Sequence, residues 1–130
     1  MDQSPLVTEE IEAGARFVAE FDKFRPVQSA FWLKESEGNR YLYVASDQIT
    51  DDNFDVAYGE VVRVPGIWQD PWFDPFQVKL IGSDHPLAKA AADFQKRYEM
   101  RRPVRFPGKS FGDLAVEEVY LYSIPITVPR

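Results

Sequence analysis

Two neighbouring segments, residues 27–36 and 40–49, are apolar on both of the faces that a β-strand presents. They read VQSAFWLKES and RYLYVASDQI, and the Gly38-Asn39 step between them is typical of a tight turn. The pattern predicts a β-hairpin, and in its first strand the apolar side chains alternate between the faces in the order Ala30, Phe31, Trp32 and Leu33. Each face of this hairpin must therefore be covered by other elements or meet a partner.

Two other segments have the apolar spacing of amphipathic helices. Residues 8–24 begin at Thr8, whose hydroxyl can cap free backbone amides, and they end before Pro26. Residues 83–100 carry an apolar stripe at helical spacing, with Pro86 in the first turn, where its missing N–H does no harm. Charged residues lie opposite both stripes, so each helix is expected to lie on a core.

Residues 50–64 fit two different patterns. Phe54, Ala57, Tyr58 and Val61 have helical spacing, but alternate residues of the same segment also fit a strand. A threonine followed by two aspartates is a typical helix start, and on this ground we expect a helix that begins at the threonine.

The rest of the chain completes the fold prediction. We expect strands over residues 76–82 and 114–126, with a loop over residues 101–113. The order α-β-β-α-β-α-β indicates an α+β fold: a single layer of four or five mainly antiparallel strands, with about three helices on one face. A chain of 130 residues fits one domain, residues 1–130.

The succession of a helix, AFWL, YLYVAS, AYGEVV and a strand-helix-strand tail resembles short bacterial proteins of unknown function. The resemblance spans most of the chain and depends on apolar patterning, not on a chemical signature. It implies a helix over residues 50–64, and it carries over no activity, cofactor or site residue.

Composition excludes some classes of function. The chain has no cysteine, which rules out disulfides, thiolate metal sites and cysteine nucleophiles. Its net charge of −6 disfavours general affinity for nucleic acid. The sequence shows neither a secretory signal nor a membrane span, so we expect a soluble, cytoplasmic protein without a membrane partner.

The most unusual stretch of the sequence is residues 66–77, GIWQDPWFDPFQ. Closely spaced prolines exclude a helix here, and the rings are too apolar for an ordinary solvated loop. The stretch is either a lid over the protein's own core or a surface that meets a partner. For the second case, the aromatic residues expected at an interaction surface are Trp32, Trp68, Trp72, Phe73 and Phe76.

A basic run covers residues 96–109, in which Glu99 is the only acid. Aromatic residues are interleaved with the cations, as a phosphate-binding groove would need. The alternative is that the cations pair with acidic residues elsewhere in the fold or on a partner. The residues concerned are Arg97, Arg101, Arg102, Arg105 and Lys109.

No catalytic signature is evident in the sequence. His85 is the only histidine, and its place at a helix start favours a capping role. Glu117 and Glu118 would point to opposite faces of a strand, so they form one site only if a β-bulge intervenes. We therefore expect no catalytic residue, no bound metal and no cofactor.

The composition and motifs together favour a small interaction domain that binds another protein or a second copy of itself. A nucleic-acid or polyanion binder using residues 96–109 is the alternative. A carboxylate-based enzyme is the third hypothesis.

Overall fold

The computed structural model describes residues 8–35, 39–50, 52–68, 77–98, 103–107, 110–111 and 114–123. The elements follow one another along the chain as α1 (Thr8–Phe24), β1 (Ser29–Glu35), β2 (Arg40–Ser46), α2 (Phe54–Trp68), β3 (Val78–Gly82), α3 (Pro86–Tyr98), β4 (Val104–Pro107), β5 (Ser110–Phe111) and β6 (Leu114–Leu121). The α+β class and the order of elements predicted from the sequence are confirmed, with β4 and β5 added.

The strands form one mixed sheet in the order β3-β2-β1-β6-β4, and β5 pairs with β6 off this path. The hairpin partners β1 and β2 are antiparallel, and so are the pairs that β6 makes with β1, β4 and β5. β3 runs parallel to β2, because α2 carries the chain back to the starting end of the sheet before β3 begins. The prediction of a mainly antiparallel sheet is therefore confirmed.

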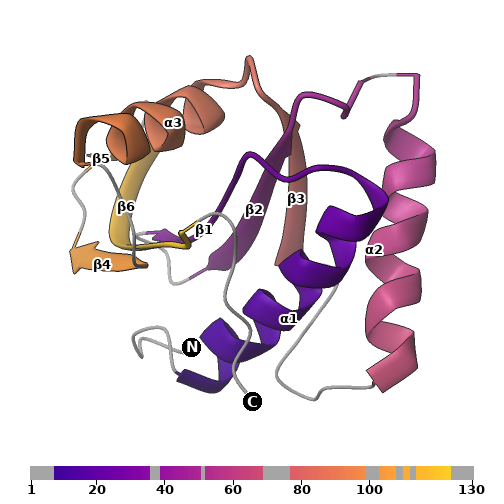
Figure 1. Ribbon diagram of the computed structural model, residues 1–130. Helices are drawn as coiled ribbons and strands as arrows, with labels where there is room; N and C mark the ends of the chain where they lie inside the picture. Colours follow the sequence, from indigo (N-terminus) through magenta and orange to yellow (C-terminus); the bar gives the residue numbers. More distant parts are fainter. Residues whose placement is uncertain are drawn as a thin grey trace.

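The helices cover both faces of the sheet, and the prediction that they share one face is wrong. Figure 1 shows α1 and α2 on one side of the sheet and α3 on the other. Trp32 and Leu42 belong to the hydrophobic cluster under α1 and α2, whereas Phe31 and Leu33 belong to the cluster under α3. The two apolar faces of the hairpin account for this arrangement, because each of them needs a helical layer of its own.

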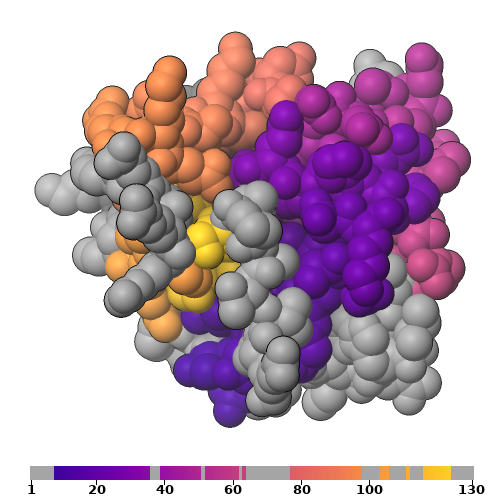
Figure 2. Space-filling model, in the orientation of Figure 1, coloured from indigo at the N-terminus to yellow at the C-terminus, as the bar shows by residue number. Residues whose placement is uncertain are grey.

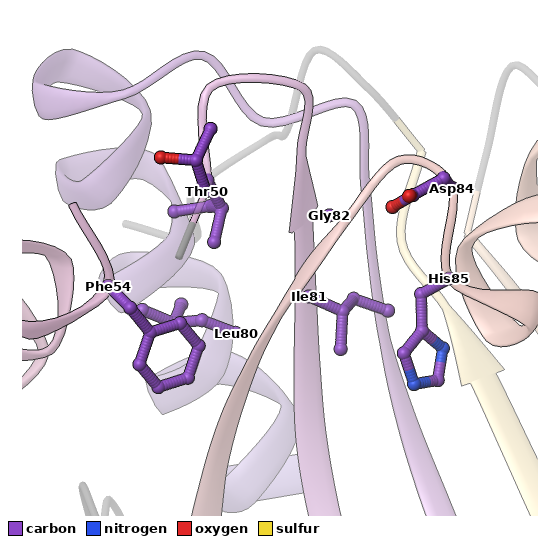
Figure 3. A pocket seen from close by; sticks show the side chains of 8 residues that line it. Thr50, Phe54, Leu80, Ile81, Gly82, Asp84 and His85 are labelled. Carbon is purple, nitrogen blue, oxygen red and sulfur yellow. The ribbon is translucent and has the colours of Figure 1, made fainter. Parts of the chain in front are cut away.

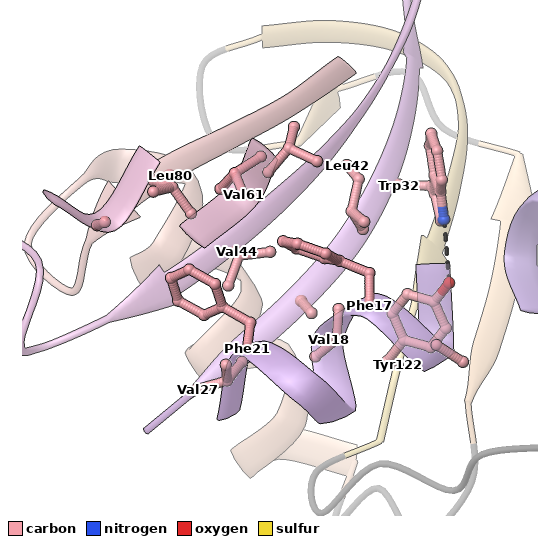
Figure 4. Packing of buried hydrophobic residues seen from close by; sticks show 14 of the residues in the cluster. Phe17, Val18, Phe21, Val27, Trp32, Leu42, Val44, Val61, Leu80 and Tyr122 are labelled. Atoms are coloured by element: carbon pink, nitrogen blue, oxygen red, sulfur yellow. Dashed lines mark hydrogen bonds between the residues drawn. The ribbon is translucent and has the colours of Figure 1, made fainter. Parts of the chain in front are cut away.

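The α1 side holds the larger aromatic core (Figure 4). Phe17 and Phe21 of α1 are fully buried and point towards the sheet. Trp32 projects from β1 into the same cluster, together with Tyr122, which directly follows β6. Full burial of an apolar side chain of this size contributes about 1.5–3 kcal/mol before entropy is subtracted. In the space-filling view of Figure 2, α1 covers much of the face that is shown.

The helix predicted over residues 50–64 is present, but it begins at Phe54 instead of Thr50. Asn53 is responsible, because its backbone oxygen accepts the Ala57 N–H at 2.9 Å while its side chain organises the preceding turn. The Asn53 Oδ1 atom accepts the Thr50 N–H at 2.8 Å, and its Nδ2 donates to the Gln48 carbonyl at 2.6 Å. Asn53 is thus the N-cap residue by its backbone, although its side chain bonds the turn before the helix. At its other end the helix continues to Trp68, so the expectation that residues 66–77 exclude a helix is wrong for residues 66–68.

The loop predicted over residues 101–113 contains two strands, which is a further correction. Val104 pairs with Leu121 in the β4–β6 ladder, and Phe111 pairs with Leu114 in the β5–β6 ladder. The prolines of this segment suggested a loop, but an edge strand tolerates proline because one row of its backbone groups faces away from the sheet. β4 is such an edge strand.

A β-bulge interrupts β6 at Glu117. Lys34 of β1 lies opposite Glu118, and Glu35 lies opposite Val116, so Glu117 is an extra residue in the ladder. Val116 and Val119 both belong to the α3-side cluster. The two glutamates between them therefore lie on the α1 side together.

Among the described residues, no helix is long and apolar enough to cross a membrane.

Candidate functional site

A pocket of about 430 Å³ opens at the carboxyl ends of the parallel strands β2 and β3 (Figure 3). In open sheets with parallel strands this is the end at which ligands commonly bind. The volume lies within the range of small-ligand sites. The pocket is lined by Ile49, Thr50, Phe54, Leu80, Ile81, Gly82, Asp84 and His85.

One wall is the turn that leads from β3 into α3. The His85 N–H donates to the Gly82 carbonyl at 3.1 Å, and the His85 carbonyl accepts the Lys89 N–H at 3.0 Å as the first helical bond. The His85 Nδ1 atom accepts the Leu87 N–H at 3.1 Å. The ring therefore caps α3, as the sequence predicted, and in the neutral ring Nε2 carries the hydrogen.

Gly82 lines the pocket without adding a side chain to it. A Cβ atom at this position would lie 3.0 Å from the Asp84 Oδ1 atom and 3.4 Å from the Ile49 carbonyl oxygen. The Asp84 carboxylate therefore lies close over Gly82, in the space that a side chain at this position would share.

The opposite wall comes from the start of α2. The Phe54 ring is 38% exposed, although its centroid lies 4.8 Å from that of the Tyr58 ring. Figure 3 shows Phe54 and His85 on opposite sides, with Leu80 and Ile81 between them. The pocket therefore combines an exposed aromatic ring with a small number of polar groups.

All the formal charges on the chain segments that line the pocket are negative. Residues 47–55 and 80–88 contain no lysine or arginine. They do contain five aspartates: Asp47, Asp51, Asp52, Asp55 and Asp84. Asp51 lies outside the described residues, and Lys79 and Lys89 flank the second segment, so the charge that the structure places in the lining is that of Asp84.

A second group of ionisable side chains lies on the α1 side of the sheet, around the β-bulge. Buried Arg40 of β2 pairs with buried Glu10 of α1, with 2.5 Å between Nη1 and Oε1. Buried Lys34 pairs with Glu117 at 3.4 Å from Nζ to Oε1, and the Arg105 guanidinium contacts Glu118. The described cluster thus matches acids to bases, which suits a structural role in fixing α1 and β6 on the sheet.

The bulge changes the sequence-based view of the two glutamates. They lie on one face of the sheet and not on opposite faces, as expected if a β-bulge intervenes. Each of them contacts a cation of a neighbouring strand, so together they form two ion pairs and not an open carboxylate site.

Trp32, expected at an interaction surface, is a core residue. It is 1% exposed, and its indole Nε1 donates to the Tyr122 hydroxyl at 3.0 Å. Trp68 is the last residue of α2, and its side chain lies outside the described part of the chain. Trp72, Phe73 and Phe76 also lie outside the described residues, and so does the choice between lid and surface for most of residues 66–77.

Two of the predicted basic residues have acidic partners within the chain. Arg97 is exposed on α3 and pairs with Asp93 at 3.1 Å, and Arg105 of β4 contacts Glu118. The other three, Arg101, Arg102 and Lys109, lie outside the described residues.

Most of the pocket residues carried no signal that sequence reasoning could have used alone. Thr50 and Phe54 are close to each other in the chain, but Asp84 is distant from both. They meet because β3 is parallel to β2, which places the segments after these strands at one end of the sheet. From the sequence, Thr50 and the aspartates that follow it were interpreted only as a helix start.

Within the described residues, no group of three or more histidine, aspartate or glutamate side chains is arranged to hold a metal ion. Comparison with known proteins found no matching family model, no similar curated protein and no similar solved structure. The function is accordingly inferred from the geometry of the pocket itself.

Proposed function

We propose that this protein is a small binding domain that acts by contact and holds another protein through the pocket between α2, β3 and α3. The pocket supports this proposal most directly, because it is a concave site of small-ligand volume that offers an exposed aromatic ring and a few polar groups. We further propose that it acts in the cytoplasm, as expected from the sequence.

The surroundings of the ionisable groups favour binding over catalysis. The His85 Nδ1 atom already accepts a backbone hydrogen bond, so the ring is held as a helix cap. Glu117 and Glu118 contact Lys34 and Arg105, so both carboxylates already take part in ion pairs within the chain. A binding domain requires neither a nucleophile nor a general base from these residues.

The charge distribution favours a protein partner over nucleic acid. The chain carries a net charge of −6, and the pocket segments are acidic. Arg97 and Arg105 contact acids of their own chain, which reduces the positive potential that they present to a phosphate backbone.

Site-specific photocrosslinking in an extract of the native cells tests the proposal. A photoreactive phenylalanine analogue replaces exposed Thr50 at the pocket, and the matched control places it at exposed Ala92 on α3. We expect a discrete adduct with one protein from position 50 and none from position 92. The purified partner should then bind the wild-type domain and lose most of its affinity for a Phe54→Ala variant.

The same adducts from both positions would contradict the proposal, and so would a partner that binds the Phe54→Ala variant as tightly as the wild type. Thermal unfolding of that variant serves as a control. Phe54 is 38% exposed, so its replacement should leave the fold intact.

A further inference from the structure

The geometry points to a specific chemical class for the occupant: we infer that the pocket receives an arginine side chain of the partner protein. This inference rests on the proposed function and adds the chemistry of recognition to it. Two features of the pocket support it, namely the Asp84 carboxylate and the exposed ring of Phe54.

The charge of the pocket selects a cation. Asp84 is the ionisable acid in the lining, and Thr50 adds a hydroxyl that can accept a hydrogen bond. Around them, residues 47–55 and 80–88 contribute only negative formal charges. An anionic ligand would be repelled by this field, whereas a cation would be attracted and could form a charge-assisted hydrogen bond with the carboxylate.

The aromatic wall favours a flat cation. Phe54 leaves 38% of its surface exposed where it lines the pocket, so its ring face can accept a stacked guanidinium. A guanidinium is planar and only weakly hydrated, so it can stack on a ring and still direct N–H groups at a carboxylate. An ammonium group is a compact, strongly hydrated charge and uses this combination less well.

The residues between the two walls of the pocket add no open apolar surface. Leu80 and Ile81 lie between Phe54 and His85 (Figure 3), but both are buried and belong to clusters on opposite faces of the sheet. Recognition therefore depends on a planar cationic head that stacks on Phe54 and directs N–H groups towards Asp84. Arginine is the amino acid that carries such a head.

The test compares two small probes of nearly equal shape, butylguanidinium and butylurea, added to ¹⁵N-labelled protein. Only the first carries a charge. We expect butylguanidinium to shift the amide signals of Thr50, Gly82 and His85 and to bind at least about tenfold more tightly than butylurea. Asp84→Asn should remove most of this preference, because asparagine carries no charge.

A matched control separates a local contact from general charge. Asp93→Asn removes one negative charge from exposed α3, at a residue that does not line the pocket. It should leave the preference for butylguanidinium intact. Phe54→Leu keeps an apolar side chain and should weaken butylguanidinium more than butylurea.

The outcomes distinguish the two proposals. Equal affinity for both probes, with shifts at the same pocket residues, would overturn the arginine inference and leave the binding function standing. If neither probe shifts the amide signals of the pocket residues and the photocrosslinking experiment also fails, both proposals are overturned. Self-association that raises the molecular mass with concentration and is reversed by butylguanidinium would identify a second copy of this chain as the source of the arginine. That result would contradict the proposal of a separate partner protein.

Discussion

The indole Nε1–H of Trp32 donates a hydrogen bond to the hydroxyl of Tyr122, 3.0 Å away. The same hydroxyl donates to the carbonyl of Ile11 in α1 at 2.5 Å. One buried oxygen thus joins the central strand of the sheet, the residue that follows β6, and the helix that covers them. A buried polar group that loses its partner costs about 1–3 kcal/mol, so this link matters to the stability of the α1 layer.

A double-mutant cycle on this pair is the first prediction. Tyr122→Phe should lower the free energy of unfolding by about 1–3 kcal/mol, because it leaves the Trp32 Nε1–H without its acceptor and removes a second hydrogen bond from the Ile11 carbonyl. Trp32→Phe should cost a comparable amount through the lost bond and the space it opens. Chemical denaturation should show that the double variant is less destabilised than the sum of the two single variants, with a coupling free energy of about 0.5–3 kcal/mol. Strict additivity would mean that the bond contributes nothing to stability.

The second prediction uses two glycines in helices as a matched pair. A Cβ atom on Gly14 of α1 would lie 2.5 Å from the Tyr122 hydroxyl and 2.9 Å from the Trp32 Nε1, whereas one on Gly59 of α2 would meet nothing within 4 Å. Gly14→Ala should therefore destabilise the protein by about 1–3 kcal/mol through overpacking. Gly59→Ala should stabilise it by about 0.5–1 kcal/mol through helix propensity. Thermal unfolding midpoints that move in the same direction for both variants would contradict this.

The third prediction concerns the edge of the sheet. The Tyr58 hydroxyl of α2 donates to the Val78 carbonyl at 3.1 Å and accepts the Leu80 N–H at 3.2 Å. These two backbone groups belong to β3, an edge strand in the sheet order, and the hydroxyl occupies the place where a further strand would bind.

Tyr58→Phe should therefore speed hydrogen exchange at the Leu80 amide and promote self-association that depends on concentration. Native-state exchange and light scattering measure the two effects. Tyr41→Phe, on the α3 side of the sheet, is the control and should change neither. Unaltered exchange at Leu80 in the Tyr58 variant would show that the hydroxyl does not protect the edge.

The fourth prediction is a loss of stability at high pH. Burial raises the pKa of Tyr122 well above the usual 10.0, and burial also raises the pKa of Tyr43 and of Tyr120. Above pH 10.0 the unfolded chain releases phenolic protons that the folded chain retains. The stabilisation is therefore fully present below that pH and is lost as the pH rises towards the folded-state pKa values.

Denaturation at a series of pH values, with phenolate absorbance as a second signal, measures this effect. The free energy of unfolding should fall steadily above pH 10.0, and it should fall less steeply in Tyr122→Phe. A flat profile between pH 10 and pH 12 would refute the effect of burial on these phenols.

The class and the order of elements apart from β4 and β5 were predictable, because the hairpin and two amphipathic helices have strong local patterns and a helix start signal decided the ambiguous residues 50–64. Apolar periodicity did not show which face each helix covers, since Trp32 and Phe31 are equally apolar and only tertiary packing assigns them to different clusters. β4 was missed because proline is typical of loops, and Pro103 precedes this strand while Pro107 ends it. An edge strand accommodates proline, since one row of its backbone groups faces away from the sheet.

The candidate site was less accessible from the sequence than the fold. His85 was correctly predicted to cap a helix, but its proximity to Thr50 and Phe54 depends on the parallel pairing of β3 with β2. Sequence spacing does not encode such a pairing, because α2 and a further segment of chain separate the two strands. The capping role of His85 was therefore predictable, whereas the contact between the segments that follow β2 and β3 was not.

The bulge at Glu117 has an evolutionary consequence. A chain lacking this residue would pair Lys34 with Glu118 and Glu35 with Val116 in unbroken alternation, so no other side chain of β6 would change the layer that it faces. Deletions inside a strand normally turn every later side chain to the wrong side. At this position the lineage could gain or lose a codon and keep both cores, with the Lys34–Glu117 ion pair as the only described contact at stake.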